Sequence, residues 1–228
     1  MKFLGFYPET AVARIRAASP SPRVPTLLES LGTGAGGFCA VSVVVFAGGA
    51  LTEEWLRRRV GEAGSYAVYA LAFIFLAGGL FRRLVIKPAP WIRFYIVFAL
   101  AFLLYSAGWA TGWVFLRNKP GEWLGSLIGT MALGLTLGAA FDAPKQTLKI
   151  IGALFLTRSA GYFLGELLQH AIPGFAGRLL WGATYGLGLG TGIGYSLYAC
   201  QEPLRARLRT GAAEPAAAAR AHPDSGHE

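Results

Sequence analysis

Six stretches of almost continuously apolar sequence constrain this chain more than any other feature. They cover residues 31–51, 66–86, 91–116, 123–141, 147–168 and 177–200. Each is close to the roughly 20 residues that a helix needs to cross a bilayer core of about 30 Å. Strands of a membrane barrel are excluded, because they have about ten residues of alternating polarity. We therefore expect an all-α integral membrane protein, a compact bundle of six transmembrane helices.

The composition fits a chain that has the lipid bilayer as its main partner. Hydrophobic residues make up 54% of the 228 residues and charged residues only 14%, whereas a soluble domain carries about 25% charged residues. Backbone groups in lipid have no water to bond, so they must be satisfied within helices or closed barrels. The composition therefore argues against a soluble enzyme or signalling domain.

The basic residues predict the orientation of the bundle. Most of them lie in the N-terminal stretch, in the links after the second and fourth apolar stretches, and in the tail. An excess of Lys and Arg in short segments marks the cytoplasmic side. We expect both termini to be cytoplasmic, in a bacterial inner membrane. The net charge of +9 is explained by anionic lipid headgroups, so no nucleic-acid partner is expected.

Three regions follow from these patterns. Residues 1–30 are expected to form a cytoplasmic or interfacial segment, with a short helix around Val12 and Ile15 on the membrane surface. Residues 31–203 form the transmembrane domain. Residues 204–228 read as a basic and then disordered tail.

The glycines are spaced as expected for helices in close contact. Residues four apart lie on one helix face, and glycine there lets another backbone approach closely in a membrane. The rows are Gly182, Gly186, Gly190 and Gly194, then Gly108 with Gly112, and Gly161 with Gly165. The pattern predicts glycine-mediated helix packing, within one bundle or between protomers of a homo-oligomer. A sliding or solute-lining surface is the alternative.

Two of the apolar stretches resemble each other. The sequence ending in Tyr105-Ser-Ala-Gly-Trp109 matches the one ending in Arg158-Ser-Ala-Gly-Tyr162. Each is followed by a short link and a glycine-rich stretch. The third and fourth stretches and the fifth and sixth are therefore interpreted as a duplicated helical hairpin in one orientation, a repeat type found in transporters with sites at the repeat interface. The alternative is a chance match, which sequences built from few apolar residue types also produce.

Arg158 is the outstanding polar residue, because it lies near the middle of stretch 147–168. A charge at that depth costs about 2.5–3.5 kcal/mol on insertion scales. Glu166 is too far along the same helix to pair with it. Other spans, through Glu53, Glu54 or Asp142, or backbone carbonyls would have to supply the partner. Arg158 is either a structural pin bonded to neighbouring carbonyls and hydroxyls, or a counter-charge for an anionic solute or lipid headgroup.

The acidic residues near span ends form a further candidate site. Glu53 and Glu54 close the first span, and Glu166 and His170 close the fifth, so together they could form a polar mouth. The sequence Glu53-Glu54-Trp-Leu-Arg-Arg58 resembles the paired-Glu-then-Arg signature of the CAAX-protease-like membrane peptidases. In that family the first Glu activates a water with the help of His residues on later helices. The resemblance covers six residues, and His170 is the only histidine before the tail, so a general base has no visible partner.

No nucleophile set, phosphate loop or metal cluster is visible, so we expect no catalytic residues, metal or cofactor. The favoured function is a small channel or transporter for a small solute, with Arg158 as a mid-membrane electrostatic anchor and Tyr162 and Glu166 beside it. The alternative is a non-transporting subunit that scaffolds a larger membrane complex. An intramembrane enzyme that uses Glu53 and Glu54 ranks third.

Overall fold

The computed structural model describes residues 6–18, 22–86 and 91–209, and all regular structure in these residues is helical. The elements are α1 (Pro8–Ala18), α2 (Leu27–Gly32), the π-helical turn η2 (Thr33–Gly37), α3 (Phe38–Phe81), the 3-10 turn η3 (Arg82–Leu84), α4 (Trp91–Leu116), α5 (Lys119–Ala140), α6 (Pro144–Ala171) and α7 (Phe175–Cys200). Residues 202–209 are helical as well. Helix α4 has the predicted bounds, and α5, α6 and α7 differ from the predicted ones by a few residues.

The first two apolar stretches differ from the prediction, because they belong to one continuous helical run. Residues Leu27–Leu84 are helical throughout, except that Gly61 has φ 74° and ψ 179°. This left-handed backbone is open to glycine at little cost, and it turns α3 back on itself. The two parts of α3 then run antiparallel: the rings of Phe38 and Phe81 are 5.7 Å apart, and those of Phe46 and Phe73 are 6.4 Å apart.

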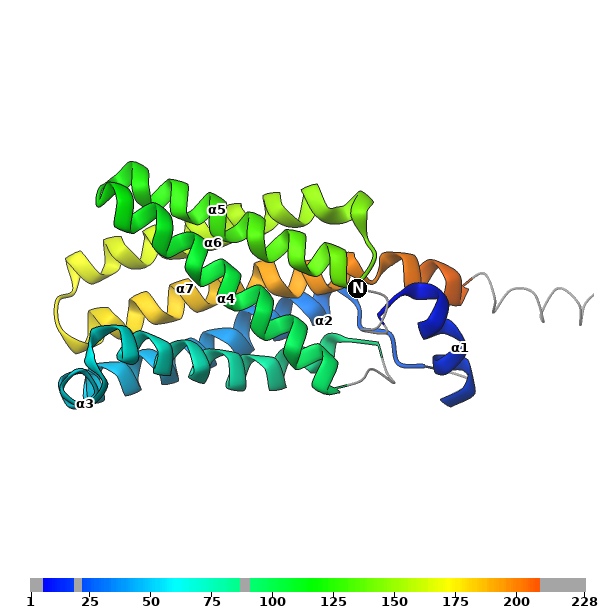
Figure 1. The fold of residues 1–228 in the computed structure, drawn as a ribbon, viewed down its shortest axis with the longest axis horizontal. Helices are drawn as coiled ribbons and strands as arrows, with labels where there is room; N and C mark the ends of the chain where they lie inside the picture. The colour runs from blue at the N-terminus through cyan, green and yellow to red at the C-terminus, as the bar shows by residue number, and fades with distance from the viewer. Residues whose placement is uncertain (1–5, 19–21, 87–90, 210–228) are drawn as a thin grey trace, which may run out of the picture.

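The helices form an elongated bundle with two different ends (Figure 1). The terminal end carries α1, η3 and residues 202–209. The distal end carries the turn at Gly61 and the links α4–α5 and α6–α7. Both described chain ends therefore lie on the same side of the bundle. Asn118 begins α5 by accepting a hydrogen bond from the Gly121 amide at 2.9 Å, a cap that allows a tight distal turn.

Three helices in the described part of the chain are long and apolar enough to cross a membrane, judged by length and composition: Leu27–Leu84, Trp91–Leu116 and Lys119–Ala140. Helices α6 and α7 have 28 and 26 residues, which is also long enough. Lys145, Lys149, Arg158 and Glu166 make α6 less apolar, and the many glycines do the same for α7.

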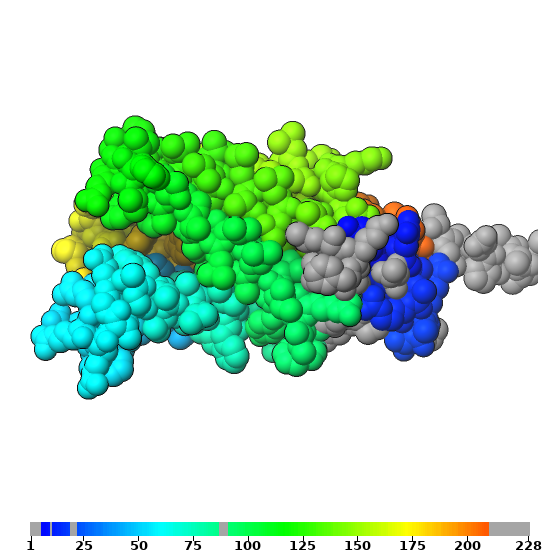
Figure 2. Space-filling view, in the orientation of Figure 1, coloured from blue at the N-terminus to red at the C-terminus, as the bar shows by residue number. Residues whose placement is uncertain are grey.

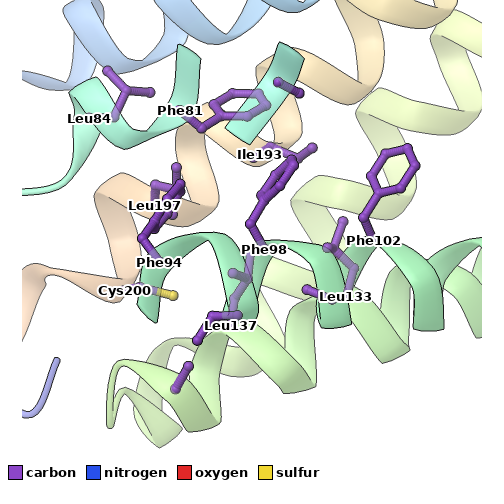
Figure 3. Packing of buried hydrophobic residues seen from close by; sticks show 14 of the residues in the cluster. Phe81, Leu84, Phe94, Phe98, Phe102, Leu133, Leu137, Ile193, Leu197 and Cys200 are labelled. Carbon is purple, nitrogen blue, oxygen red and sulfur yellow. The ribbon is translucent and has the colours of Figure 1, made fainter. Parts of the chain in front are cut away.

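The terminal half of the bundle is a tightly filled apolar core. Phe94, Phe98, Leu133 and Leu197 have no exposed surface, and Figure 3 shows such side chains from α3, α4, α5 and α7 meeting between the helices. Aromatic rings stack along this core, with Phe81 and Phe98 5.6 Å apart. Close packing of this kind leaves little space for water.

Glycines bring the backbones of α7 and its neighbours together on two sides. An added Cβ at Gly182, Gly186, Gly190 or Gly194 would collide with residues of the α2–α3 run, for example with the Gly34 carbonyl at Gly190. An added Cβ at Gly188 would collide with the Thr157 carbonyl of α6. Helix α7 therefore lies between the α2–α3 run and α6.

The region boundaries differ from the expected ones in two places. Helix α2 begins at Leu27, before the expected start of the membrane domain at residue 31. Helical structure also continues to residue 209, past the expected start of the tail at 204. Ile15 of α1 is buried with Leu204 and Ile86 in a small apolar cluster, so the expected N-terminal helix packs on the terminal end. Residues 210–228 lie outside the described residues.

Candidate functional site

Arg158 lies halfway along α6 and is 1% exposed. We call α4–α5 the first hairpin and α6–α7 the second hairpin. Arg158 belongs to the second hairpin, and its neighbours on α4 and α5 belong to the first, so it lies at the interface of the two. This position agrees with the expectation that the guanidinium is deeply buried. What surrounds it was not predictable residue by residue.

Two hydroxyl groups accept hydrogen bonds from Arg158. The Nε group donates to the Tyr105 hydroxyl of α4 at 3.0 Å, and Nη1 donates to the Ser126 hydroxyl of α5. Each hydroxyl is bonded in turn to a second one: Tyr105 to Tyr185 at 3.1 Å and Ser126 to Ser159 at 3.0 Å. Because a guanidinium only donates, each hydroxyl that accepts from it keeps its own O–H free to donate to the second hydroxyl.

Aromatic rings cover the rest of the guanidinium. Its central carbon lies 4.3 Å from the centre of the Tyr162 ring and 6.0 Å from that of Trp109. Tyr162 also contacts Trp181 of α7, with ring centres 5.7 Å apart. Cation–π contacts of this kind contribute roughly 2 kcal/mol or more when they are desolvated.

No carboxylate in the described part of the chain forms an ion pair with Arg158, so the acidic partners considered from the sequence are not its partners. Glu166 pairs with Lys119, and Glu53 pairs with Arg178 at 3.1 Å. Glu54 pairs with Arg57 and Arg58 of its own helix. Asp142 lies in the link between α5 and α6, at the terminal end. The structure thus brings Arg158 and Tyr162 together and places the three glutamates elsewhere.

The two hairpins meet at equivalent residues. In the sequence match, Tyr105 corresponds to Arg158 and Trp109 to Tyr162. Tyr105 bonds Arg158, and the rings of Trp109 and Tyr162 are 6.3 Å apart. Tyr105 and Arg158 also each bond the second helix of the other hairpin. Tyr105 bonds Tyr185 of α7, and Arg158 bonds Ser126 of α5. The interface between the hairpins therefore joins matched residues around Arg158, although the two sides of it differ: α5 packs closely on α6, whereas α4 and α7 lie further apart.

The glycine contacts repeat in the same way. An added Cβ at Gly108 would meet the backbone of Gly129 in α5, and one at Gly161 would meet that of Gly188 in α7. One turn further on, Gly112 faces Gly125, and Gly165 faces Trp181 and Thr184. At each of the predicted glycine pairs, an added Cβ would therefore collide with the partner helix of the same hairpin.

Two indole groups beside the site were not found by sequence reasoning. The Nε1 atoms of Trp109 and Trp181 are buried, and neither has a hydrogen-bond partner among the described residues. Such groups are costly to leave unpaired, by about 1–3 kcal/mol each. From the sequence, Trp181 reads as an interfacial anchor, because an aromatic residue near a span end usually is one. Trp109 stands out only as part of the sequence match between the two stretches.

His170, the one histidine before the tail, contacts its own helix, and the described residues form no metal site. His170 Nδ1 contacts the Glu166 carbonyl at 2.8 Å. Within residues 6–18, 22–86 and 91–209, no group of three His, Cys, Asp or Glu side chains could hold a metal ion. Cys39 and Cys200 are free thiols.

Family models, curated proteins and solved structures were compared with this chain, and none of the three comparisons finds a match.

Proposed function

We propose that this protein is a six-span integral membrane protein that moves a small solute, with Arg158 as the electrostatic anchor of the solute path. In this proposal α3 supplies two spans, one on each side of Gly61. The membrane is the bacterial inner membrane, and the terminal end faces the cytoplasm. The observation that carries the proposal is a buried guanidinium at the interface of two equivalent hairpins, with only neutral partners.

The position of Arg158 supports transport. In transporters built from repeats, the solute site lies near the bilayer midplane at the interface of the repeats. Ionisable residues inside a membrane face protein or water and often mark such a path. Arg158 lies midway along α6 and contacts α4 and α5 of the other hairpin.

The difference between the two halves of the bundle supports the same idea. The terminal half is filled by apolar rings, and the contacts between the rings of α3 and α4 extend distally as far as Phe73 and Phe102, whose centres are 5.8 Å apart. Nearer the distal end the face shown in Figure 2 is hollowed between α3 (cyan) and α4 and α5 (green), and α7 (gold) is visible below. A bundle closed at one end and indented at the other fits one state of an alternating-access cycle.

Liposome flux measurements test the proposal. The full chain is reconstituted, and permeation of small inorganic ions, organic anions and amino acids is followed for the wild type, Arg158→Ala and Arg59→Ala. Flux of at least one solute class that falls tenfold or more in Arg158→Ala, and is kept in the exposed control Arg59→Ala, is the expected result. Absence of wild-type flux, together with a stoichiometric partner in mild detergent, would favour the scaffold subunit instead.

A reporter fusion tests the orientation. An enzyme reporter that is active only outside the cytoplasm is joined after residue 209 in one variant and in the α4–α5 link in another. Activity in the second fusion alone is expected for a cytoplasmic terminal end. The opposite pattern would reverse the orientation.

A further inference from the structure

Three side chains with hydrogen-bond donors gather where the two hairpins meet, and the described residues supply too few acceptors for them. Arg158 has five N–H donors, and the hydrogen bonds found among the described residues use only Nε and Nη1. The buried Nε1 atoms of Trp109 and Trp181 add two more donors without partners. All of these side chains contact Tyr162.

The charge of this cluster is also unbalanced locally. Arg158 is 1% exposed, and no described carboxylate lies within ion-pair distance. The nearest acids along α6 and α5, Glu166 and Glu122, are engaged with Lys119. A buried cation without an anion is strongly unfavourable, so a ligand with one negative charge would complete the site.

The rings around the cluster indicate the shape of the rest of the ligand. Trp109, Tyr162, Trp181 and Phe46 form a chain of ring contacts that passes from α4 through α6 and α7 to α3. Neighbouring rings in this chain are tilted by 60°, 67° and 80°, so they pack edge to face and form a continuous aromatic surface beside the guanidinium. A flat apolar group can stack against such faces, whereas a hydrated inorganic ion gains nothing from them.

We infer that the solute is a small organic monoanion in which a carboxylate is joined to a flat apolar ring. The carboxylate accepts from the free edge of the Arg158 guanidinium, a pairing that favours two parallel hydrogen bonds. The indole N–H groups of Trp109 and Trp181 donate to the remaining lone pairs, and the ring packs on Tyr162. The inference rests on the proposed function, since it names the solute class of that site.

Calorimetric titration of the purified full chain in detergent tests the inference. Benzoate serves as the complete probe, benzamide as the same ring without charge, acetate as the charge without a ring, and inorganic phosphate as the free phosphate. Benzoate is expected to bind at least tenfold more tightly than each of the other three. Equal binding of benzoate and benzamide, preferential binding of phosphate, or no binding of any probe would overturn the inference.

Variants separate a ligand site from a general effect on folding. Arg158→Gln is expected to weaken benzoate binding at least tenfold, and Arg158→Lys several-fold, because lysine keeps the charge but not the paired geometry. Trp109→Phe and Trp181→Phe keep a ring but lose the N–H, and each is expected to weaken binding several-fold, whereas the distant Trp91→Phe leaves it unchanged. If Arg158→Gln does not give a monodisperse protein on gel filtration, the two tryptophan variants decide: unchanged binding in both would overturn the inference.

The binding and flux results fail independently. Flux of neutral or cationic solutes without benzoate binding would remove the solute class and keep transport. Benzoate binding that depends on Arg158 without flux of any solute would keep the site and remove transport. Phosphatidic-acid vesicles added in competition identify a lipid source: displacement of benzoate by these vesicles, but not by phosphatidylcholine vesicles, would overturn the assignment to a free carboxylate.

Discussion

The two hairpins share one packing pattern but differ in one charge. Gly108 and Gly161 bring their partner helices into backbone contact at matched positions, and the matched residues Tyr105 and Arg158 bond each other at the interface. At this position the first hairpin has the phenol side chain of Tyr105, which is 4% exposed. A neutral side chain is therefore compatible with this architecture. The comparison supports the proposal that the guanidinium of the second hairpin has a role beyond packing.

The largest effect is expected from substitutions that test whether both hairpins share the same glycine packing. Gly108→Leu and Gly161→Leu should each prevent a stable bundle or lower its stability by more than about 3 kcal/mol, because an added side chain meets backbone that cannot move aside. The measurement is the yield of monodisperse protein and its thermal unfolding in detergent.

Gly152→Leu is the matched control for this experiment. Gly152 lies on the same helix as Gly161, but nothing lies within 4 Å of an added Cβ there. It should leave the yield unchanged. If one hairpin tolerates its substitution and the other does not, the two hairpins do not share the same packing.

The second prediction asks whether the charge of Arg158 supports the fold. Arg158→Met should leave stability unchanged or raise it by about 1–4 kcal/mol, as replacements of buried charged groups by apolar ones often do. Tyr105 and Ser126 would still have Tyr185 and Ser159 as partners. Thermal unfolding of the two proteins measures this. A loss of more than about 2 kcal/mol would instead make Arg158 a structural pin.

The third prediction compares the two hydroxyl groups that form hydrogen bonds between the hairpins, those of Ser126 and Tyr185. Ser126 accepts from a charged donor, whereas Tyr185 bonds a neutral phenol. Ser126→Ala should therefore cost about 1.5–3 kcal/mol and Tyr185→Phe about 0.5–1.5 kcal/mol. Chemical or thermal unfolding with Arg158→Met as a second background checks the cause, since the excess cost of Ser126→Ala should disappear there.

The smallest effect is expected at the ion pair that joins the hairpins near the distal end. Lys119 of the first hairpin contacts Glu166 of the second, and its side chain is 58% exposed. Exposed pairs contribute about 0–1 kcal/mol, so Lys119→Gln should change the unfolding temperature little and only at low salt. A large loss would mean that this end, and not the buried interface, holds the hairpins together.

The apolar stretches predicted much of the fold because their length and period are local properties. Helix α4 and the glycine pairs of both hairpins could be placed from the sequence. The turn at Gly61 could not, since the residues around it, among them Glu62 and Arg57, favour helix, and only one residue departs from it. The expected link between the first two spans is therefore helical on both sides of that residue.

The surroundings of Arg158 were only partly predictable. Its burial follows from its place in an apolar stretch, and hydroxyl partners were one of the alternatives. The identity of those partners depends on which helices lie side by side, and this is set by glycine contacts far along the chain. The sequence match aligned Tyr105 with Arg158, yet an alignment does not show that matched residues touch. The unpaired indole donors become visible only when the neighbours of Trp109 and Trp181 are known.

The single left-handed residue in α3 decides more than a local bend. As a straight rod, the 44 residues of α3 would measure about 66 Å, more than twice the thickness of a hydrocarbon layer of about 30 Å. In a bilayer such a rod would cross once instead of twice, and every later segment would change sides. Arg82 and Arg83 would then face the compartment opposite to the one that holds α1. In the proposed six-span arrangement, one backbone angle at Gly61 thus fixes the parity of crossings for the remainder of the chain.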